Sequence, residues 1–207
     1  MSQPNHPTCT DTRSRLLASA RELFSSQGYS AASTRAIAAR AGCNLALISH
    51  YFGSKEGLLR AAIAEPFEKV EAELRRLVSA PEPATSRLDT FIRFMVDHFA
   101  VHQAEMRICQ AELNLATSPV ADEVRPRVHT NLELLASLIA QVREEGPMAD
   151  VDPHIGALLL LGMLQMPFSS RAVTLGVHDT SSPAALEPIK RNISALFLQG
   201  ARSGDSK

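Results

Sequence analysis

Residues 34–59 read TRAIAARAGCNLALISHYFGSKEGLL, and they contain two short helical patterns on either side of the sequence Ala41-Gly42-Cys43-Asn44. A turn of three or four residues that contains glycine, between two short helices, is typical of a helix-turn-helix. Small residues are needed where the two helices cross, and Ala38, Ala41 and Gly42 meet this need. The stretch therefore predicts a helix-turn-helix, with its second helix over residues 45–51.

Helical patterns also extend on both sides of this stretch, because apolar residues recur with the 3.6-residue period of an α-helix. One pattern runs from Leu16 to Phe24 and ends near Gly28, and a longer one runs from Ser54 to Ser79. Pro66 lies inside the longer pattern, where its missing amide hydrogen must kink or break the helix. No strand-like alternation of useful length occurs. The sequence predicts an all-α fold of about nine helices.

Charge is distributed unevenly along the 207 residues, although the formal net charge is only -1. Residues 1–54 hold five arginines against Asp11 and Glu22, whereas acidic residues outnumber basic ones in the rest of the chain. A basic N-terminal part indicates that this part meets a polyanion.

Three isolated cysteines, Cys9, Cys43 and Cys109, predict neither a disulfide framework nor a zinc site, and they fit a reducing cytoplasm. The polar N-terminus does not resemble a signal peptide. The longest apolar stretch, residues 155–168, is too short to span a bilayer. We therefore expect a cytoplasmic protein with no membrane segment, no metal and no cofactor.

Four spaced elements together resemble the DNA-binding domain of TetR-type transcriptional regulators. They are LLASARELFSSQGY, IAARAG, HYF and SKEGLL, all within residues 12–65. The resemblance implies a helix-turn-helix DNA-binding domain over residues 10–70 and a ligand-binding and dimerisation domain over residues 71–207. It implies a transcriptional regulator, more often a repressor than an activator.

The resemblance also implies which side chains contact DNA. Residues at the start of the second helix, and residues at the start of the helix that follows the helix-turn-helix, would bind phosphate. The N-terminus of a helix also favours an anion. Base edges would be read by residues 44–50. Leu45, Ala46 and Leu47 offer no bidentate hydrogen bonds, so readout would rest on polar neighbours and on apolar contacts with thymine methyl groups. The predicted DNA-binding residues are Thr34, Arg35, Asn44, Leu45, Ala46, Ser49, His50, Tyr51 and Lys55.

Members of this family bind a small molecule between the helices of the second domain, which separates the two DNA-reading heads. Soft and apolar side chains suit such a pocket, although buried phenylalanine and methionine are routine in any core. The candidate effector-pocket residues are Phe91, Met95, His98, Phe99, Cys109, Met163 and Met166.

The last two long helices carry more apolar residues than one narrow stripe requires, so a second surface must cover them. One DNA-binding domain makes few contacts with bases, so useful affinity would need two copies of the protein on a palindromic operator. We therefore expect a homodimer. The candidate interface residues are Ile155, Leu158, Leu159, Ile193, Leu196 and Phe197.

The chain contains no GxSxG, P-loop, dinucleotide or HExxH motif, which argues against an enzyme. One alternative stays open at this point. The same helical fold could serve as a ligand carrier or a protein-interaction module with no specific DNA target.

Overall fold

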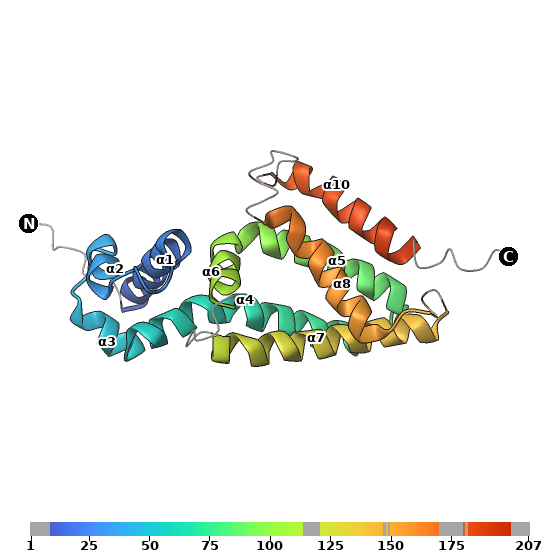
Figure 1. Cartoon of the computed structure of the whole chain (residues 1–207), viewed down its shortest axis with the longest axis horizontal. Helices are drawn as coiled ribbons and strands as arrows, with labels where there is room; N and C mark the ends of the chain where they lie inside the picture. Colours follow the sequence, from blue (N-terminus) through green and yellow to red (C-terminus); the bar gives the residue numbers. More distant parts are fainter. Residues whose placement is uncertain are drawn as a thin grey trace, which may run out of the picture. The chain divides into compact units, whose positions relative to one another are not determined.

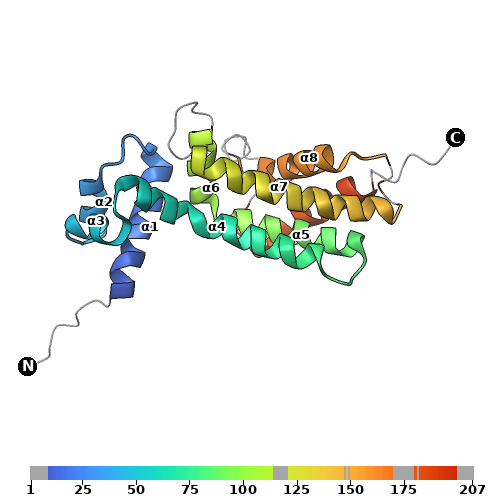
Figure 2. The ribbon, with the colours of Figure 1, turned by 90° about the horizontal axis from the view of Figure 1, so that it is seen from below.

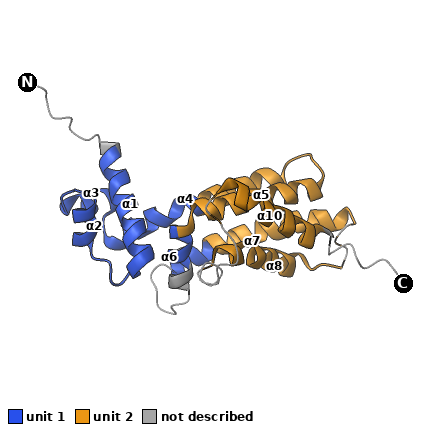
Figure 3. Cartoon of the chain, turned by 90° about the horizontal axis from the view of Figure 1, so that it is seen from above, with its two compact units in different colours: residues 1–66, 104–126 blue, residues 67–103, 127–207 orange. Residues whose placement is uncertain are grey.

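The computed structural model describes residues 9–113, 121–146, 148, 150–169, 180 and 182–199. These residues form nine α-helices and no strand, which confirms the all-α prediction. The chain folds into two compact units (Figure 3). Unit 1 contains residues 1–66 and 104–126, and unit 2 contains residues 67–103 and 127–207.

Unit 1 is built on the N-terminal helices (Figure 1). Its core is made by one apolar face of each helix, and the side chains of Leu16, Ile37, Ile48 and Leu58 are almost fully buried. The segment around helix α6 also belongs to this unit, although it follows much later in the sequence. The helices are α1 (Cys9–Gln27), α2 (Thr34–Arg40), α3 (Ala46–Phe52), the start of α4 (Lys55–Val78), α6 (Gln103–Leu113) and the first turn of α7 (Ala121–Glu144).

Local sequence signals set the helix ends in unit 1. Gly28, with φ of 81°, follows the last residue of α1 in the left-handed conformation that glycine adopts readily. The Ser33 hydroxyl accepts a hydrogen bond from the Ala36 amide at 3.1 Å, and the Ser54 hydroxyl accepts one from Gly57 at 3.1 Å. The Ser33 cap sets the start of α2, and the Ser54 cap confirms the predicted start of α4.

The sequence predicted a kink or a break at Pro66, and of these two outcomes the break does not occur, because helix α4 continues through Pro66. Proline cannot donate to the carbonyl group four residues earlier, which here belongs to Ala62. The Arg21 Nε atom of helix α1 donates to this carbonyl oxygen instead, at 3.0 Å. A side chain from another helix thus satisfies the acceptor that proline leaves open.

Unit 2 is a bundle in which the remainder of α4 and helix α7 run side by side (Figures 1 and 2). Gln141 of α7 donates to the Val78 carbonyl at 3.3 Å. Lys190 of the last α-helix forms an ion pair with Asp97 of α5 at 2.8 Å, which ties these two helices together. The further elements are α5 (Ala84–Val101), α8 (Pro153–Gln165), the 3-10 turn η1 (Met166–Phe168), α10 (Pro183–Ser194) and the π-helical turn η2 (Ala195–Gln199).

Helix α8 is apolar on nearly all sides, but the described part of the chain covers only one of them. Leu160 and Leu164 are buried, whereas Ile155, Leu158 and Leu159 are exposed. Asp152 caps its start by accepting hydrogen bonds from two backbone amides. None of the helices that the structure describes is both long enough and apolar enough to cross a bilayer.

The substitution Gly57→Ala tests the junction between α3 and α4. A Cβ atom at this position would lie 1.9 Å from the Phe52 carbonyl oxygen, so the two helices would have to separate. We expect the free energy of unfolding to fall by about 1–3 kcal/mol, the usual cost of overpacking, measured by chemical denaturation. The exposed neighbour Glu56→Gln serves as control, and an unchanged or raised stability in Gly57→Ala would contradict the prediction.

Candidate nucleic-acid interface

Helix α3 presents a row of small, uncharged side chains to solvent. Ile48 is buried and attaches the helix to the core of unit 1. Leu45, which is 43% exposed, precedes the helix. Ala46, Ser49 and His50 are exposed as well. The predicted base-reading residues therefore lie on one accessible side of a short helix, as major-groove reading requires.

Asn44 has a structural role that the sequence did not reveal. Its Oδ1 atom accepts a hydrogen bond from the Ala46 amide at 2.9 Å, which caps the start of α3. Bidentate recognition of adenine needs both the oxygen and the amide group of an asparagine. A base that donates to this oxygen would share it with the Ala46 amide, whereas the amide group of Asn44 can donate to a base without this competition.

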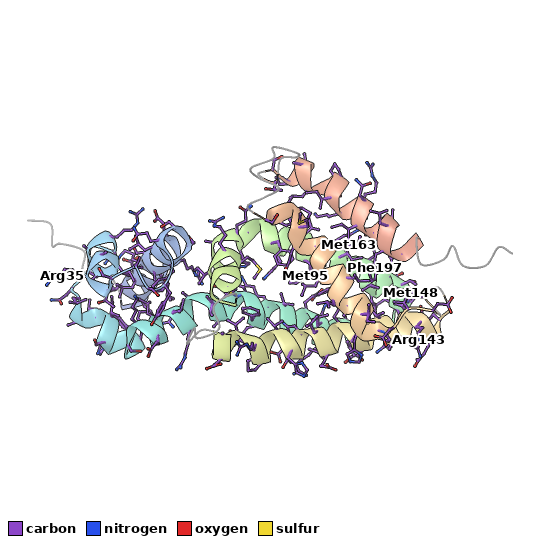
Figure 4. The ribbon with its side chains drawn as sticks, in the orientation of Figure 1. Arg35, Met95, Arg143, Met148, Met163 and Phe197 are labelled. Atoms are coloured by element: carbon purple, nitrogen blue, oxygen red, sulfur yellow. The ribbon has the colours of Figure 1, made fainter. Side chains whose placement is uncertain are left out.

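The start of helix α2 lies beside this surface in the same unit. Thr34 is its first residue and is half-buried, while the Arg35 side chain is exposed at the surface of unit 1 (Figure 4). No acidic side chain forms an ion pair with Arg35 among the residues that the structure describes. Its guanidinium group is therefore available to an external anion.

The other arginines of the N-terminal part differ in whether they form an ion pair with a carboxylate. Arg15 pairs with Asp11 at 3.5 Å, and Arg40 pairs with Glu22. Arg13 instead lies over the Phe52 ring, with 5.3 Å between the guanidinium carbon and the ring centre, so it sits at the end of α3. Arg13 was not among the predicted DNA-binding residues, because sequence spacing does not place residue 13 next to residue 52.

The surface around α3 carries basic side chains but no acidic ones. No acidic residue occurs between Glu22 and Glu56, so α2, α3 and the loops around them carry no negative side chain. Glu22 is itself neutralised by Arg40. A continuous segment without acids, with exposed guanidinium groups at its edge, suits the phosphate backbone of DNA.

Tyr51 near the end of α3 and Lys55 at the start of α4 both contact side chains or backbone of their own unit. Tyr51 makes an edge-on contact with the His50 ring, with ring centres 4.9 Å apart. The Lys55 ammonium lies 4.4 Å from the centre of the Tyr29 ring and donates to the Ser30 carbonyl at 3.4 Å. Lys55 would have to leave or share these contacts to reach a phosphate.

The candidate effector-pocket residues fall in both units. Cys109 is buried in unit 1, and the other six lie in unit 2. Of those six, Met166 is 56% exposed and Met163 is half-buried on α8 (Figure 4). The remaining four belong to the buried face of α5: Phe91, Met95, His98 and Phe99.

His98 is the unusual member of this buried face. Its ring stacks on Phe94 at 5.5 Å and lies 4.6 Å from the His102 ring, measured between ring centres. Burial, and to a lesser extent the charges of His102 and Lys69, lower the pKa of His98 to about 4. The imidazole is therefore neutral at pH 7 and offers one donor and one acceptor. The described residues contain no group of three side chains suited to hold a metal ion.

The candidate dimer residues also separate into two groups. Ile155, Leu158, Leu159 and Leu196 are exposed. Ile193 and Phe197, in contrast, are buried inside the chain, because the apolar face of α10 packs on α5 (Figure 4). Within the single chain, these two residues are therefore part of the core of unit 2.

Comparison with known proteins agrees with this geometry. A family described as "Bacterial regulatory proteins, tetR family" matches residues 16–62, and one described as "Tetracyclin repressor-like, C-terminal domain" matches residues 81–168. The HTH-type transcriptional dual regulator CecR of Shigella flexneri is 33% identical over 124 residues, which cover 55% of this chain and 49% of CecR, so the match spans about half of that protein. The HTH-type transcriptional repressor NicS of Pseudomonas putida is 30% identical over 205 residues, 92% of each chain.

Among solved structures, FadR of Bacillus subtilis in complex with stearoyl-CoA has the same fold, with a TM-score of 0.72 and 16% identity over 90% of this chain and 98% of FadR. The full-length similarity to NicS and the two family matches agree with the exposed recognition helix and its acid-free surroundings. The chain belongs to the TetR family of DNA-binding transcriptional regulators.

Proposed function

We propose that this regulator is a repressor that binds a palindromic operator as a homodimer and leaves it when a small molecule binds. The observation that carries this proposal is the acid-free surface of unit 1, with the exposed side of α3 at its centre and Arg13 and Arg35 at its edge. NicS is named a repressor and CecR a dual regulator, so relatives of both kinds exist.

In the proposed complex, α3 enters the major groove and backbone contacts set its register. Thr34, Arg35, Tyr51 and Lys55 contact phosphate, and Arg13 joins them from α1. Asn44, Leu45, Ala46, Ser49 and His50 face the base edges. Phosphate contacts supply affinity that falls with salt, and base contacts supply specificity. We assign DNA binding to residues 10–70, and effector binding and dimerisation to residues 71–207.

The exposed side of α8 is the proposed dimer surface. Ile155, Leu158 and Leu159 on α8, and Met166 at the start of the turn η1 that follows, are each more than half exposed. Gly162 also lies on α8, and a Cβ atom there would meet nothing within 4 Å in this chain. A second helix can therefore approach the α8 backbone closely. Two copies of α8, together with Leu196, would form the centre of the interface. A stable dimer buries about 800 Å² of surface per partner, so neighbouring residues would extend the interface beyond this centre.

The effector is proposed to be a mainly apolar molecule with one polar group. FadR, which shares the fold, was solved with stearoyl-CoA. In unit 2, Phe91, Met95 and Phe99 share the buried face of α5 with the neutral His98, which can form a hydrogen bond with such a group. Soft side chains of this kind adapt to ligands of different shape.

Retention of genomic DNA tests the central proposal. Purified protein is incubated with sheared DNA of its source organism at fixed, moderate salt, and the retained fragments are sequenced. We expect a small number of palindromic sites, with binding that weakens steeply as salt increases. Uniform retention without preferred sites, or no retention at low salt, would contradict a specific operator and would favour the carrier or interaction module.

Arg35→Gln is expected to weaken binding to the retained sites about 3- to 10-fold and to reduce the slope of log affinity against log salt by about one for each head. The reason is the loss of one exposed cation that has no partner within the described part of the chain. Arg75→Gln is the matched control, because Arg75 is paired with Glu71 in unit 2. Equal affinities and slopes for the two variants would rule out a phosphate contact by Arg35.

Leu159→Glu is expected to raise the dimer dissociation constant about 10- to 100-fold, because a leucine contribution of about 1.5–3 kcal/mol is lost at the interface. Sedimentation equilibrium measures the change. Val101→Glu is the control, since Val101 is 75% exposed but lies on α5. If the two variants sediment alike, α8 is not the dimer surface.

A further inference from the structure

The Arg21 side chain links three helices of unit 1 at a single guanidinium group. Its Nε atom donates to the Ala62 carbonyl of α4, the acceptor that Pro66 leaves open. Its Nη2 atom pairs with Glu65 of α4 at 3.1 Å, and its Nε atom lies 3.1 Å from Oε1 of Glu105 in α6. A planar guanidinium can contact several acceptors in fixed directions, which a lysine cannot do.

The Glu105 contact is buried, unlike the Glu65 contact. The Glu105 side chain is 7% exposed, whereas that of Glu65 is 50% exposed. A buried carboxylate is strongly disfavoured when an opposite charge beside it is removed. The Arg21–Glu105 pair therefore joins the first turn of α6 to α1 within unit 1.

Helix α1 contacts both α6 and the end of α3 in the DNA-binding surface. Arg13 on the same helix lies over the ring of Phe52, the last residue of α3. Arg13 and Arg21 are eight residues apart, or about 12 Å along a helix. One rigid helix thus contacts the recognition helix near one arginine and α6 near the other.

We propose that Arg21 is a positioning residue that couples the order of helix α6 to the DNA-bound state of helix α3. The inference rests on the proposed function, because it needs a DNA-bound state. Coupling between two sites is reciprocal, so DNA bound at α3 must stabilise α6 to the same extent that an ordered α6 favours DNA.

The first arm of the test uses the protein alone. Amide hydrogen exchange in α6 is compared between the unaltered chain and the double variant Arg21→Gln, Glu105→Gln, in which both charges of the ion pair are removed together. We expect exchange in residues 103–113 to become about tenfold faster in the double variant. Arg75→Gln serves again as control. Unchanged exchange in the double variant would overturn the attachment of α6 by Arg21.

The second arm adds a retained DNA fragment. In the unaltered chain, we expect DNA to slow exchange in α6 about fivefold or more; in the double variant, which still binds DNA, the rates with and without DNA should agree within about twofold. DNA-dependent protection of α6 that persists in the double variant would overturn the coupling. An unaltered chain that retains no DNA site would overturn the proposed function before any variant is compared, and the first arm would still report on the attachment.

A third comparison separates the two roles of Arg21. In Pro66→Ala, the amide of residue 66 can donate to the Ala62 carbonyl, so the Arg21 donor is no longer needed there. Arg21→Gln should then shift the melting temperature less in the Pro66→Ala background than in the unaltered chain. Its effect on α6 exchange should remain, because that effect depends on Glu105. Equal shifts in both backgrounds would overturn the role of Arg21 at Pro66.

Discussion

The arrangement of the DNA-binding helices depends on one close contact between two backbones, where Gly57 of α4 lies against the carbonyl group of Phe52 at the end of α3. A helix of seven residues, such as α3, is not stable in water by itself. It is held at one end by this contact, at its start by the Asn44 cap, and along its length by the buried Ile48 side chain. The exposed side of α3 therefore faces solvent in one defined orientation.

In unit 1, the charge that the surface presents depends more on which arginines form ion pairs than on how many arginines there are. Arg15 and Arg40 each have a carboxylate partner, and Arg21 is engaged with α4 and α6. Arg13 and Arg35 contribute their charge to the outer surface. The positive charge around α3 thus comes mainly from these two arginines, which form no ion pair with the described residues, and no acidic residue between Glu22 and Glu56 opposes it. A protein whose net charge is close to zero can therefore still present a basic surface.

Unit 2 uses apolar residues of the same kind for two different purposes. Ile193 and Phe197 are buried against the chain's own helices, whereas Ile155 and Leu159 remain exposed on α8. A hydrophobic pattern shows that a helix face must be covered, but it does not show which element covers it. For α10 the covering element is α5, held also by the Lys190–Asp97 ion pair. For α8 no described part of the chain covers these side chains.

The sequence by itself determined the all-α class, the helix-turn-helix and most helix ends, because periodicity, capping serines and Gly28 act within a few residues of one another. It also located the exposed residues of α3. Only the tertiary structure decided that α4 passes through Pro66, since the compensating donor comes from Arg21, 41 residues from Ala62. The same holds for the contact of Lys55 with Tyr29 and for the burial of Ile193 and Phe197. These outcomes depend on contacts between side chains that are far apart in the sequence, and local sequence spacing does not specify such contacts.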